Sequence, residues 1–181
     1  MSQIAPPGTD ITVLYPAEEI SHRVHALAGE IAAAMGRNPL VVPILKGSFI
    51  FAADLLRALH DAGVEPDMDF IGLSSYRAGT RSLGEVRLVR DTEVEIIGRD
   101  VLIVDDILES GRTLAFAKNL MAARGARTIR TCVLLHKPGK LAVDVVADFV
   151  GFDCPDRFVV GYGMDVAHAY RQLPFIGFVE S

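Results

Sequence analysis

Several features that would point to other protein classes are missing from this 181-residue sequence. It has no tryptophan, only two cysteines, and no apolar run near the ~18–20 residues that a membrane-spanning helix needs. Cys132 and Cys154 are too few for a disulfide framework. The N-terminus has no basic stretch followed by an apolar one, so we expect no signal peptide. We therefore expect a cytoplasmic protein with no membrane partner.

An excess of positive charge is also missing. The formal net charge is -5 at pH 7, and proteins whose main partner is nucleic acid usually carry a basic surface. A nucleic-acid partner is therefore not expected, although a local basic patch is compatible with this charge. Half of the residues are hydrophobic, which suits a sizeable core and predicts one domain over residues 1–181.

Strand-like and helix-like patterns alternate along the chain. After Pro16, apolar residues recur at spacings of three and four, which predicts a helix that ends near Gly36. Strands separated by helices indicate an α/β fold with a mainly parallel central sheet. Pro43 is awkward there, because proline is disfavoured in central strands. The expected strands are 11–15, 40–45, 70–74, 86–90, 101–104, 128–135 and 158–160, and the later helices are 49–60 and 112–124.

The most informative segment is Val101–Leu114. An apolar strand, Val101–Val104, is followed by the acids Asp105 and Asp106 and then by Ser110–Thr113, a polar turn that opens a helix. Ligands of parallel sheets bind beyond the carboxyl ends of the strands, and a helix N-terminus offers backbone N–H groups to an anion. The carboxylates suit hydroxyls or a metal instead. A phosphate beside vicinal hydroxyls is a ribose 5-phosphate, which is the ligand that this segment predicts.

Other interpretations of this segment are open at this point. Asp105 and Asp106 would also be ordinary residues at the end of a strand and the cap of a helix. A Walker loop is excluded, because no Gly-x4-Gly-Lys precedes the Ser or Thr. A receiver-type domain would place its paired acids after the first strand of the chain rather than in the middle.

The segment resembles the phosphoribosyl pyrophosphate signature of the type I phosphoribosyltransferases. Lys46-Gly47-Ser48 after Leu45 resembles the pyrophosphate loop of the hypoxanthine-guanine members, where the Leu-Lys bond is often cis. Ser75 and Tyr76, followed by polar residues to Gly84, resemble their mobile loop. An ordinary helix-starting turn and an ordinary hairpin loop are the alternatives. The resemblance implies the type I fold, with a core of about residues 37–136 and a small hood of about residues 1–15 and 137–181.

The C-terminal part narrows the resemblance to 6-oxopurine enzymes. Residues 148–165 resemble the hood of these enzymes and its metal site, and 170–174 continues the likeness. Lys137 precedes Phe158 at a spacing that suits the lysine reaching the purine O6. Phe158 would otherwise be a core residue, and Lys137 and Arg171 would be solvated surface charges. Two residues depart from the family pattern: Glu109 stands where Asp is usual, and Asp105 where Glu is common.

The resemblance implies a role for each matched residue in purine salvage with Mg2+. A phosphoribosyl group would pass from phosphoribosyl pyrophosphate to N9 of hypoxanthine or guanine, in a homodimer or homotetramer. Glu109 would be the catalytic acid-base group, and Asp165 the metal ligand. Asp105 and Asp106 would bind the ribose; Ser110, Gly111, Arg112 and Thr113 the 5-phosphate; Lys46, Gly47 and Arg171 the pyrophosphate; and Lys137, Phe158 and Val159 the purine.

Two alternatives compete with this enzyme. One is a regulator built on the same fold that binds phosphoribosyl pyrophosphate or nucleic acid without useful catalysis. The other is a pyrimidine-specific transferase, which the match of Lys137 and Phe158 to the oxopurine pattern disfavours. The sequence does not rank hypoxanthine, guanine and xanthine, because all three offer O6.

Overall fold

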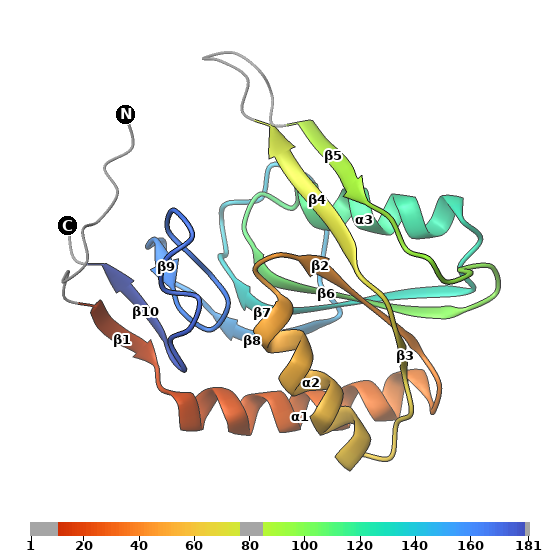
Figure 1. Cartoon of the computed structure of the whole chain (residues 1–181), viewed down its shortest axis with the longest axis horizontal. Coiled ribbons are helices and arrows are strands. Elements are labelled where there is room, and N and C mark those ends of the chain that lie inside the picture. Colours follow the sequence, from red (N-terminus) through yellow and green to blue (C-terminus); the bar gives the residue numbers. More distant parts are fainter. Residues whose placement is uncertain (1–10, 77–84, 180–181) are drawn as a thin grey trace.

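A large, mainly parallel sheet lies between helices on both of its faces in the computed structural model, which describes residues 11–76 and 85–179 (Figure 1). A second, small sheet lies at one end of the molecule, next to the start of the long first helix. The helices are α1 (Ala17–Met35), α2 (Phe49–Asp61) and α3 (Arg112–Ala123). None of the helices within 11–76 and 85–179 is both long enough and apolar enough to cross a membrane.

The large sheet has the strand order β5-β4-β2-β6-β7-β8, with the short β3 also paired to β2. Only β5 runs antiparallel to its neighbour. This architecture confirms the predicted α/β class. The strands are β2 (Leu40–Leu45), β3 (Asp67–Met68), β4 (Ile71–Tyr76), β5 (Glu85–Arg90), β6 (Asp100–Leu108), β7 (Thr128–His136) and β8 (Phe149–Asp153).

The two faces of the sheet bury separate sets of side chains, because neighbouring residues of a strand point to opposite faces. Leu102 and Val104 of β6 pack with α1 and α2, whereas Val101 and Ile103 pack with Leu114, Ala117 and Met121 of α3. Helix α1 buries the predicted stripe of Ile20, Val24, Leu27 and Ile31. Since both faces of β6 are covered, the strand is apolar without alternation, as buried parallel strands are.

The small sheet brings the two ends of the described chain together. Its order is β1-β10-β9, formed by β1 (Ile11–Tyr15), β10 (Ile176–Val179) and β9 (Val159–Val160), all antiparallel. Strand β1 leads directly into α1, so this sheet is placed beside the carboxyl ends of the central strands (Figure 1). The hood and core boundaries remain a prediction, and β8, which lies within 137–181, adds to the large sheet.

Most predicted elements are confirmed within a few residues, and one prediction about the key segment is wrong. We expected the central strand to end at Val104, with the paired acids after it. Strand β6 instead continues to Leu108, because β7 pairs with it as far as Leu108 and His136. Strands β3, β8 and β10 were not predicted from the sequence.

Pro43 is accommodated inside β2 by the arrangement of its neighbours. On one side β2 pairs with β6 through residues 40–43. On the other side, β3 pairs with Leu40 and Val41, and β4 pairs with Ile44 and Leu45. Pro43 therefore lies at the gap between β3 and β4, where the N–H that proline lacks is not required by the pairing.

The close approach of β7 and β8 gives a stability prediction for Gly151→Ala. A Cβ at this position would lie 2.4 Å from the Leu134 carbonyl oxygen, which is backbone and has little room to move. We expect the free energy of unfolding to fall by about 1–3 kcal/mol. Urea denaturation at a fixed protein concentration measures it.

Gly29→Ala is the matched control, because nothing lies within 4 Å of a Cβ added at this position of α1. We expect it to gain about 0.5–1 kcal/mol, the difference between alanine and glycine in a helix. A Gly151→Ala protein as stable as the wild type would show that β7 and β8 can separate without cost.

Candidate active site

The predicted site residues gather where the central strands end. The loop after β2 carries Lys46 and Gly47, the end of β6 carries Asp105 and Asp106, and Lys137 follows β7. The carboxyl ends of parallel strands meet at one edge of a sheet, which is where α/β proteins bind ligands. The parallel register sets Leu108 opposite His136, so that Glu109 and Lys137 leave their strands side by side.

Asp106 lies directly against the loop after β2. A Cβ on Gly47 would come within 1.8 Å of Asp106 Oδ2, so any larger residue there would displace the Asp106 carboxylate. The Leu45-Lys46 peptide bond is cis, as the resemblance implied. Ser48 follows, fully buried, and its hydroxyl donates to the Ile44 carbonyl oxygen at 2.6 Å. The loop and the acidic end of β6 therefore form one surface.

The two neighbouring carboxyls hold protons more tightly than isolated ones. Burial raises the pKa of Asp105 well above its usual range, and the adjacent Asp106 carboxylate adds to this. Burial also raises the pKa of Asp106, while hydrogen bonds from Asp105 and the Ile107 backbone and the positive charge of Arg171 oppose the rise. The pair therefore takes up a proton more readily than two isolated carboxyls would.

The turn after β6 forms a hollow at the N-terminus of α3. Gly111 has a φ of +78°, and a Cβ there would lie 2.7 Å from Val145 Cγ1 and 3.0 Å from the Val143 carbonyl oxygen. The Ser110 carbonyl oxygen accepts from the Ala142 N–H at 2.9 Å, which supports the turn from outside. The first turn of a helix presents N–H groups without intrahelical partners, and these bind anions. The cavity of about 430 Å³ is lined by Asp105, Ile107, Leu108, Glu109, Ser110, Gly111, Thr113, Leu114 and Lys140.

A second hollow adjoins the first and has a different lining. Lys137 is buried at 6% exposure, and its ammonium lies 3.4 Å from Glu109 Oε1. Phe158 is 62% exposed, while Val159 beside it is buried in β9. The surface-charge interpretation of Lys137 and the core interpretation of Phe158 are therefore both wrong. The cavity of about 160 Å³ is lined by Asp106, Ile107, Glu109, Lys137, Phe158, Val159, Met164 and Asp165.

Asp165 and Arg171 form an ion pair beside these hollows. Arg171 Nη2 lies 2.7 Å from Asp165 Oδ1, and Asp165 Oδ2 accepts from the His168 N–H at 2.7 Å. Asp165 lines the same cavity as Asp106, so carboxylate oxygens, the ligands Mg2+ prefers, face one space. Within residues 11–76 and 85–179, no three His, Cys, Asp or Glu side chains could hold a metal together. One carboxylate with phosphate and water oxygens is an ordinary Mg2+ shell, so the residues fit that ion.

The structure leaves one predicted group undescribed and adds residues that the sequence analysis did not single out. Ser75 and Tyr76 end β4, but their side chains and residues 77–84 lie outside the described part. Lys46, in the loop after β2, is exposed. Tyr162 and Asp54 make a contact across 108 positions of sequence, next to Arg171. The Gly161-Tyr162-Gly163 run, inside the resembling segment, was the available signal.

Comparison with known proteins agrees with this geometry. Residues 11–167 match the model of the phosphoribosyl transferase domain. The hypoxanthine-guanine phosphoribosyltransferase of Bacillus subtilis is 43% identical over 169 residues, which are 93% of this chain and 92% of that protein. The hypoxanthine phosphoribosyltransferase of Escherichia coli is 40% identical over 92% of this chain and 94% of its own length.

A longer relative and a solved structure extend the comparison. The bifunctional protein TilS/HprT of Listeria innocua is 45% identical over 93% of this chain, which spans only 26% of that protein's length. A crystal structure of a hypoxanthine-guanine phosphoribosyltransferase from Bacillus anthracis, with a HEPES molecule in its active site, has a TM-score of 0.88 at 41% identity. The matched region covers 94% of this chain and 100% of the chain in that structure. The chain therefore belongs to the phosphoribosyl transferase domain family, in the group of the hypoxanthine and hypoxanthine-guanine phosphoribosyltransferases.

Proposed function

We propose that this protein is a purine-salvage enzyme that transfers the phosphoribosyl group of phosphoribosyl pyrophosphate to N9 of hypoxanthine or guanine. The bond from C1′ of the ribose to pyrophosphate breaks, the bond from C1′ to N9 forms, and the purine loses its N7 proton. One observation carries the proposal: the anion hollow at α3 and the hollow under Phe158 share Ile107 and Glu109. A ribose between them would hold its 5-phosphate in one and its base in the other.

The first hollow is the proposed place of the phosphoribosyl group. Backbone N–H groups of Ser110–Thr113 would hold the 5-phosphate, because they open α3. Asp105 and Asp106 would accept hydrogen bonds from the ribose hydroxyls, and their charge would favour the cationic ribose that develops as pyrophosphate leaves. Lys46, the Gly47 N–H and Arg171 would hold the pyrophosphate, with Ser75 and Tyr76 proposed to close over it.

The second hollow is the proposed purine site. The exposed ring of Phe158 supplies a flat apolar surface for stacking, and the buried Lys137 ammonium supplies hydrogen-bond donors for O6. The Val159 backbone would pair with the base edge. Glu109 stands between the two hollows, where a carboxylate can accept the purine N7 proton as the N9 bond forms.

Mg2+ is the proposed cofactor, and Asp165 is its proposed protein ligand. When bound, the ion would neutralise negative charge on the leaving pyrophosphate. In the described structure Arg171 forms an ion pair with the Asp165 carboxylate. Its positive charge also acts to lower the pKa of Asp106. These contacts support the proposal that Arg171 binds the same leaving group.

Asp165→Asn tests the metal role. We expect turnover to fall on the order of 10- to 100-fold and the Mg2+ concentration for half-maximal rate to rise, because an amide is a weaker ligand than a carboxylate. Asp67→Asn is the control, since Asp67 forms an ion pair of equal length, 2.7 Å, with Arg99 at the opposite end of the sheet. Unchanged rate and Mg2+ titration in Asp165→Asn would remove this residue from the metal site.

A base-panel assay tests the function as a whole. The protein with phosphoribosyl pyrophosphate and Mg2+ is expected to convert hypoxanthine, and also guanine, to the nucleoside 5′-monophosphate and pyrophosphate. Filter binding of RNA and DNA in parallel tests the regulatory alternative. Tight nucleic-acid binding without product from any base would overturn the proposal.

Two further proposals concern the oligomeric state of the protein and its location in the cell. A homodimer or homotetramer is proposed from the family resemblance, and light scattering tests it. A cytoplasmic location is proposed as well; its reducing conditions suit Cys132 and Cys154, both of which are buried thiols. Burial raises the pKa of both thiols, so neither is poised for reaction at neutral pH.

A further inference from the structure

The turn between the purine and metal parts of the site has an unusual backbone. Residues Gly161–Met164, here called the hood turn, connect β9 to Asp165. Gly161, Tyr162 and Gly163 have φ values of +95°, +50° and +101°. The Gly161 N–H donates to the Met164 carbonyl oxygen, and the Met164 N–H donates back, both at 3.1 Å. Tyrosine rarely adopts a positive φ, so contacts outside the turn must favour this conformation.

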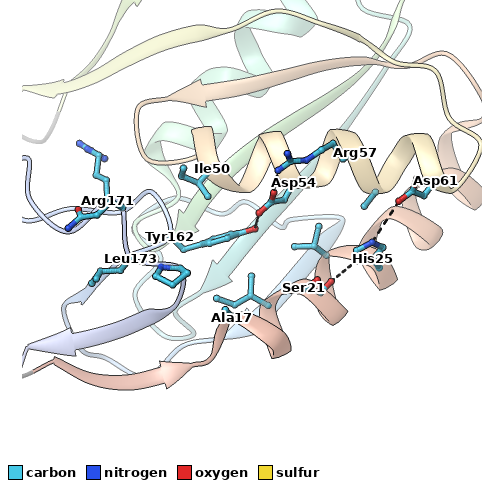
Figure 2. A pocket seen from close by; sticks show the side chains of 15 residues that line it. Ala17, Ser21, His25, Ile50, Asp54, Arg57, Asp61, Tyr162, Arg171 and Leu173 are labelled. Atoms are coloured by element: carbon cyan, nitrogen blue, oxygen red, sulfur yellow. Dashed lines mark hydrogen bonds and ion pairs between the residues drawn. The ribbon is translucent and has the colours of Figure 1, made fainter.

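The Tyr162 side chain leaves the hood turn and reaches α2. Its hydroxyl donates to Asp54 Oδ2 at 2.5 Å, and its ring is nearly buried, at 6% exposure. Figure 2 shows the ring directed at Asp54, with Arg57 on the other side of that carboxylate. Burial and the hydrogen bond to Asp54 raise the pKa of Tyr162, so the phenol remains a donor. The contact closes one wall of a cavity of about 620 Å³ between α1, α2 and residues 171–174.

The backbone of the hood turn touches two groups proposed to bind pyrophosphate. A Cβ on Gly163 would lie 2.3 Å from the Gly47 carbonyl oxygen, so the turn rests on the pyrophosphate loop. Arg171 Nη1 donates to the Gly163 carbonyl oxygen at 2.6 Å, and the Gly163 N–H donates to the Arg171 carbonyl oxygen at 3.0 Å. Asp165 follows two residues later. A shift of Gly163 would therefore move Gly47, Arg171 and Asp165 relative to one another.

We propose that Tyr162 and Asp54 are a positioning pair for the pyrophosphate and metal end of the site. Helix α2 begins at Phe49, immediately after the pyrophosphate loop, and Asp54 lies near the middle of that helix. The hydrogen bond joins the hood turn to the helix that follows the loop, and so fixes the separation of the two groups that meet at Gly163 and Gly47. The proposal rests on the proposed function of this site. The alternative is that the hydrogen bond from Tyr162 only stabilises the fold, since a buried tyrosine hydroxyl ordinarily has a hydrogen-bond partner.

Tyr162→Phe tests the pair, because it removes the hydroxyl and keeps the ring. We expect the KM for phosphoribosyl pyrophosphate to rise about 10-fold, the effect of losing one hydrogen bond to a charged group. The Mg2+ requirement should rise with it. The KM for hypoxanthine should change less, because Met164 is the one residue of the hood turn among the described residues that line the purine hollow. Binding of pyrophosphate in Mg2+, measured by calorimetry, should weaken to the same extent and needs no turnover.

Variants of the partner distinguish positioning from stability. Asp54→Ala should match Tyr162→Phe, and the double variant should be no worse than either single one. Asp54→Asn keeps an acceptor oxygen for the hydroxyl and should restore most of the affinity. Tyr15→Phe is the control, because the Tyr15 hydroxyl donates to the Asp153 carbonyl oxygen, also at 2.5 Å, away from Gly47.

Failure of the positioning pair and failure of the proposed function would give different results in these experiments. Wild-type affinity for pyrophosphate in Tyr162→Phe, or an equal loss in Tyr15→Phe, would overturn the positioning pair. Additive losses in the double variant would overturn it as well. A wild-type protein that binds pyrophosphate in this way but forms no nucleotide would instead count against the proposed function.

Discussion

Hypoxanthine is expected to be used with a kcat/KM about 10⁴-fold or more above that of adenine. The two bases differ at position 6, where hypoxanthine offers an oxygen and adenine an amine. Lys137 supplies only donors, and at 6% exposure it has little water to replace a lost acceptor. Adenine would set its amine against the Lys137 ammonium, donor against donor, and could not replace the Glu109 contact that the lysine gives up. Sites built on a buried hydrogen bond discriminate by about 10⁴–10⁵ against analogues that cannot form it.

Lys137→Met tests whether the discrimination comes from the lysine or from the shape of the hollow. We expect the variant to lose most of its activity with hypoxanthine and little of its small activity with adenine, so that the ratio of the two kcat/KM values collapses. Lys118→Met, on α3, is the control and should keep the ratio. Adenine rates comparable to hypoxanthine in the wild type would show that Lys137 does not read O6.

The pattern of apolar residues was enough to predict two kinds of element: a helix with one buried face, and a strand with both faces buried. The spacing of Ile20, Val24, Leu27 and Ile31 predicted α1, because one face of the helix packs on α2 and the sheet. The apolar run Val101–Val104 predicted the centre of β6, because both of its faces are covered. These patterns are local consequences of burial, and a single sequence shows them directly.

Pairing between distant segments was not predictable in the same way. Strand β6 continues through Asp105 and Asp106 because β7 supplies hydrogen-bond partners, and two acids give no strand signal of their own. The strands β3, β8 and β10 are short and depend on their neighbours. Resemblance placed the residues of the site in one region, but it gave no information on contacts such as that of Tyr162 with Asp54.

The position of Glu109 could have been inferred partly from parallel pairing. Glu109 and Lys137 each follow the last residue of a strand, and neighbouring parallel strands end at the same edge. The distance of 3.4 Å between Oε1 and Nζ was not available from the sequence. Glutamate has one methylene more than the aspartate usual in the family, and here the carboxylate reaches the lysine proposed to bind the purine. Base binding would therefore exchange this ion pair for contacts to the purine.

Glu109→Gln is expected to lower turnover on the order of 10²- to 10⁴-fold, the range for a positioned general acid or base. Attack by N9 requires the purine tautomer with its proton on N7, and that proton becomes acidic as the new bond forms. The Glu109 carboxylate lines both hollows and is half-exposed, so it can meet N7 of a base stacked on Phe158. Glutamine keeps the shape but cannot take the proton. The affinity for phosphoribosyl pyrophosphate should change little, because its phosphates are proposed to be held by the backbone of Ser110–Thr113, by Lys46 and Gly47, and by Arg171, not by the Glu109 carboxylate.

A merely structural Glu109 would behave differently. If the carboxylate only stabilised the N-terminus of α3, Glu109→Gln would lose less than about 1 kcal/mol of stability and keep nearly normal turnover. Glu109→Asp restores the usual family residue, so it should remain active while losing reach toward Lys137. Steady-state kinetics on both variants, with urea denaturation at equal protein concentration, distinguishes the two roles. A glutamine variant at wild-type turnover would leave Glu109 as a partner of Lys137 and of the helix. The search for the N7 base would then move to Asp106, another acid that lines the purine hollow.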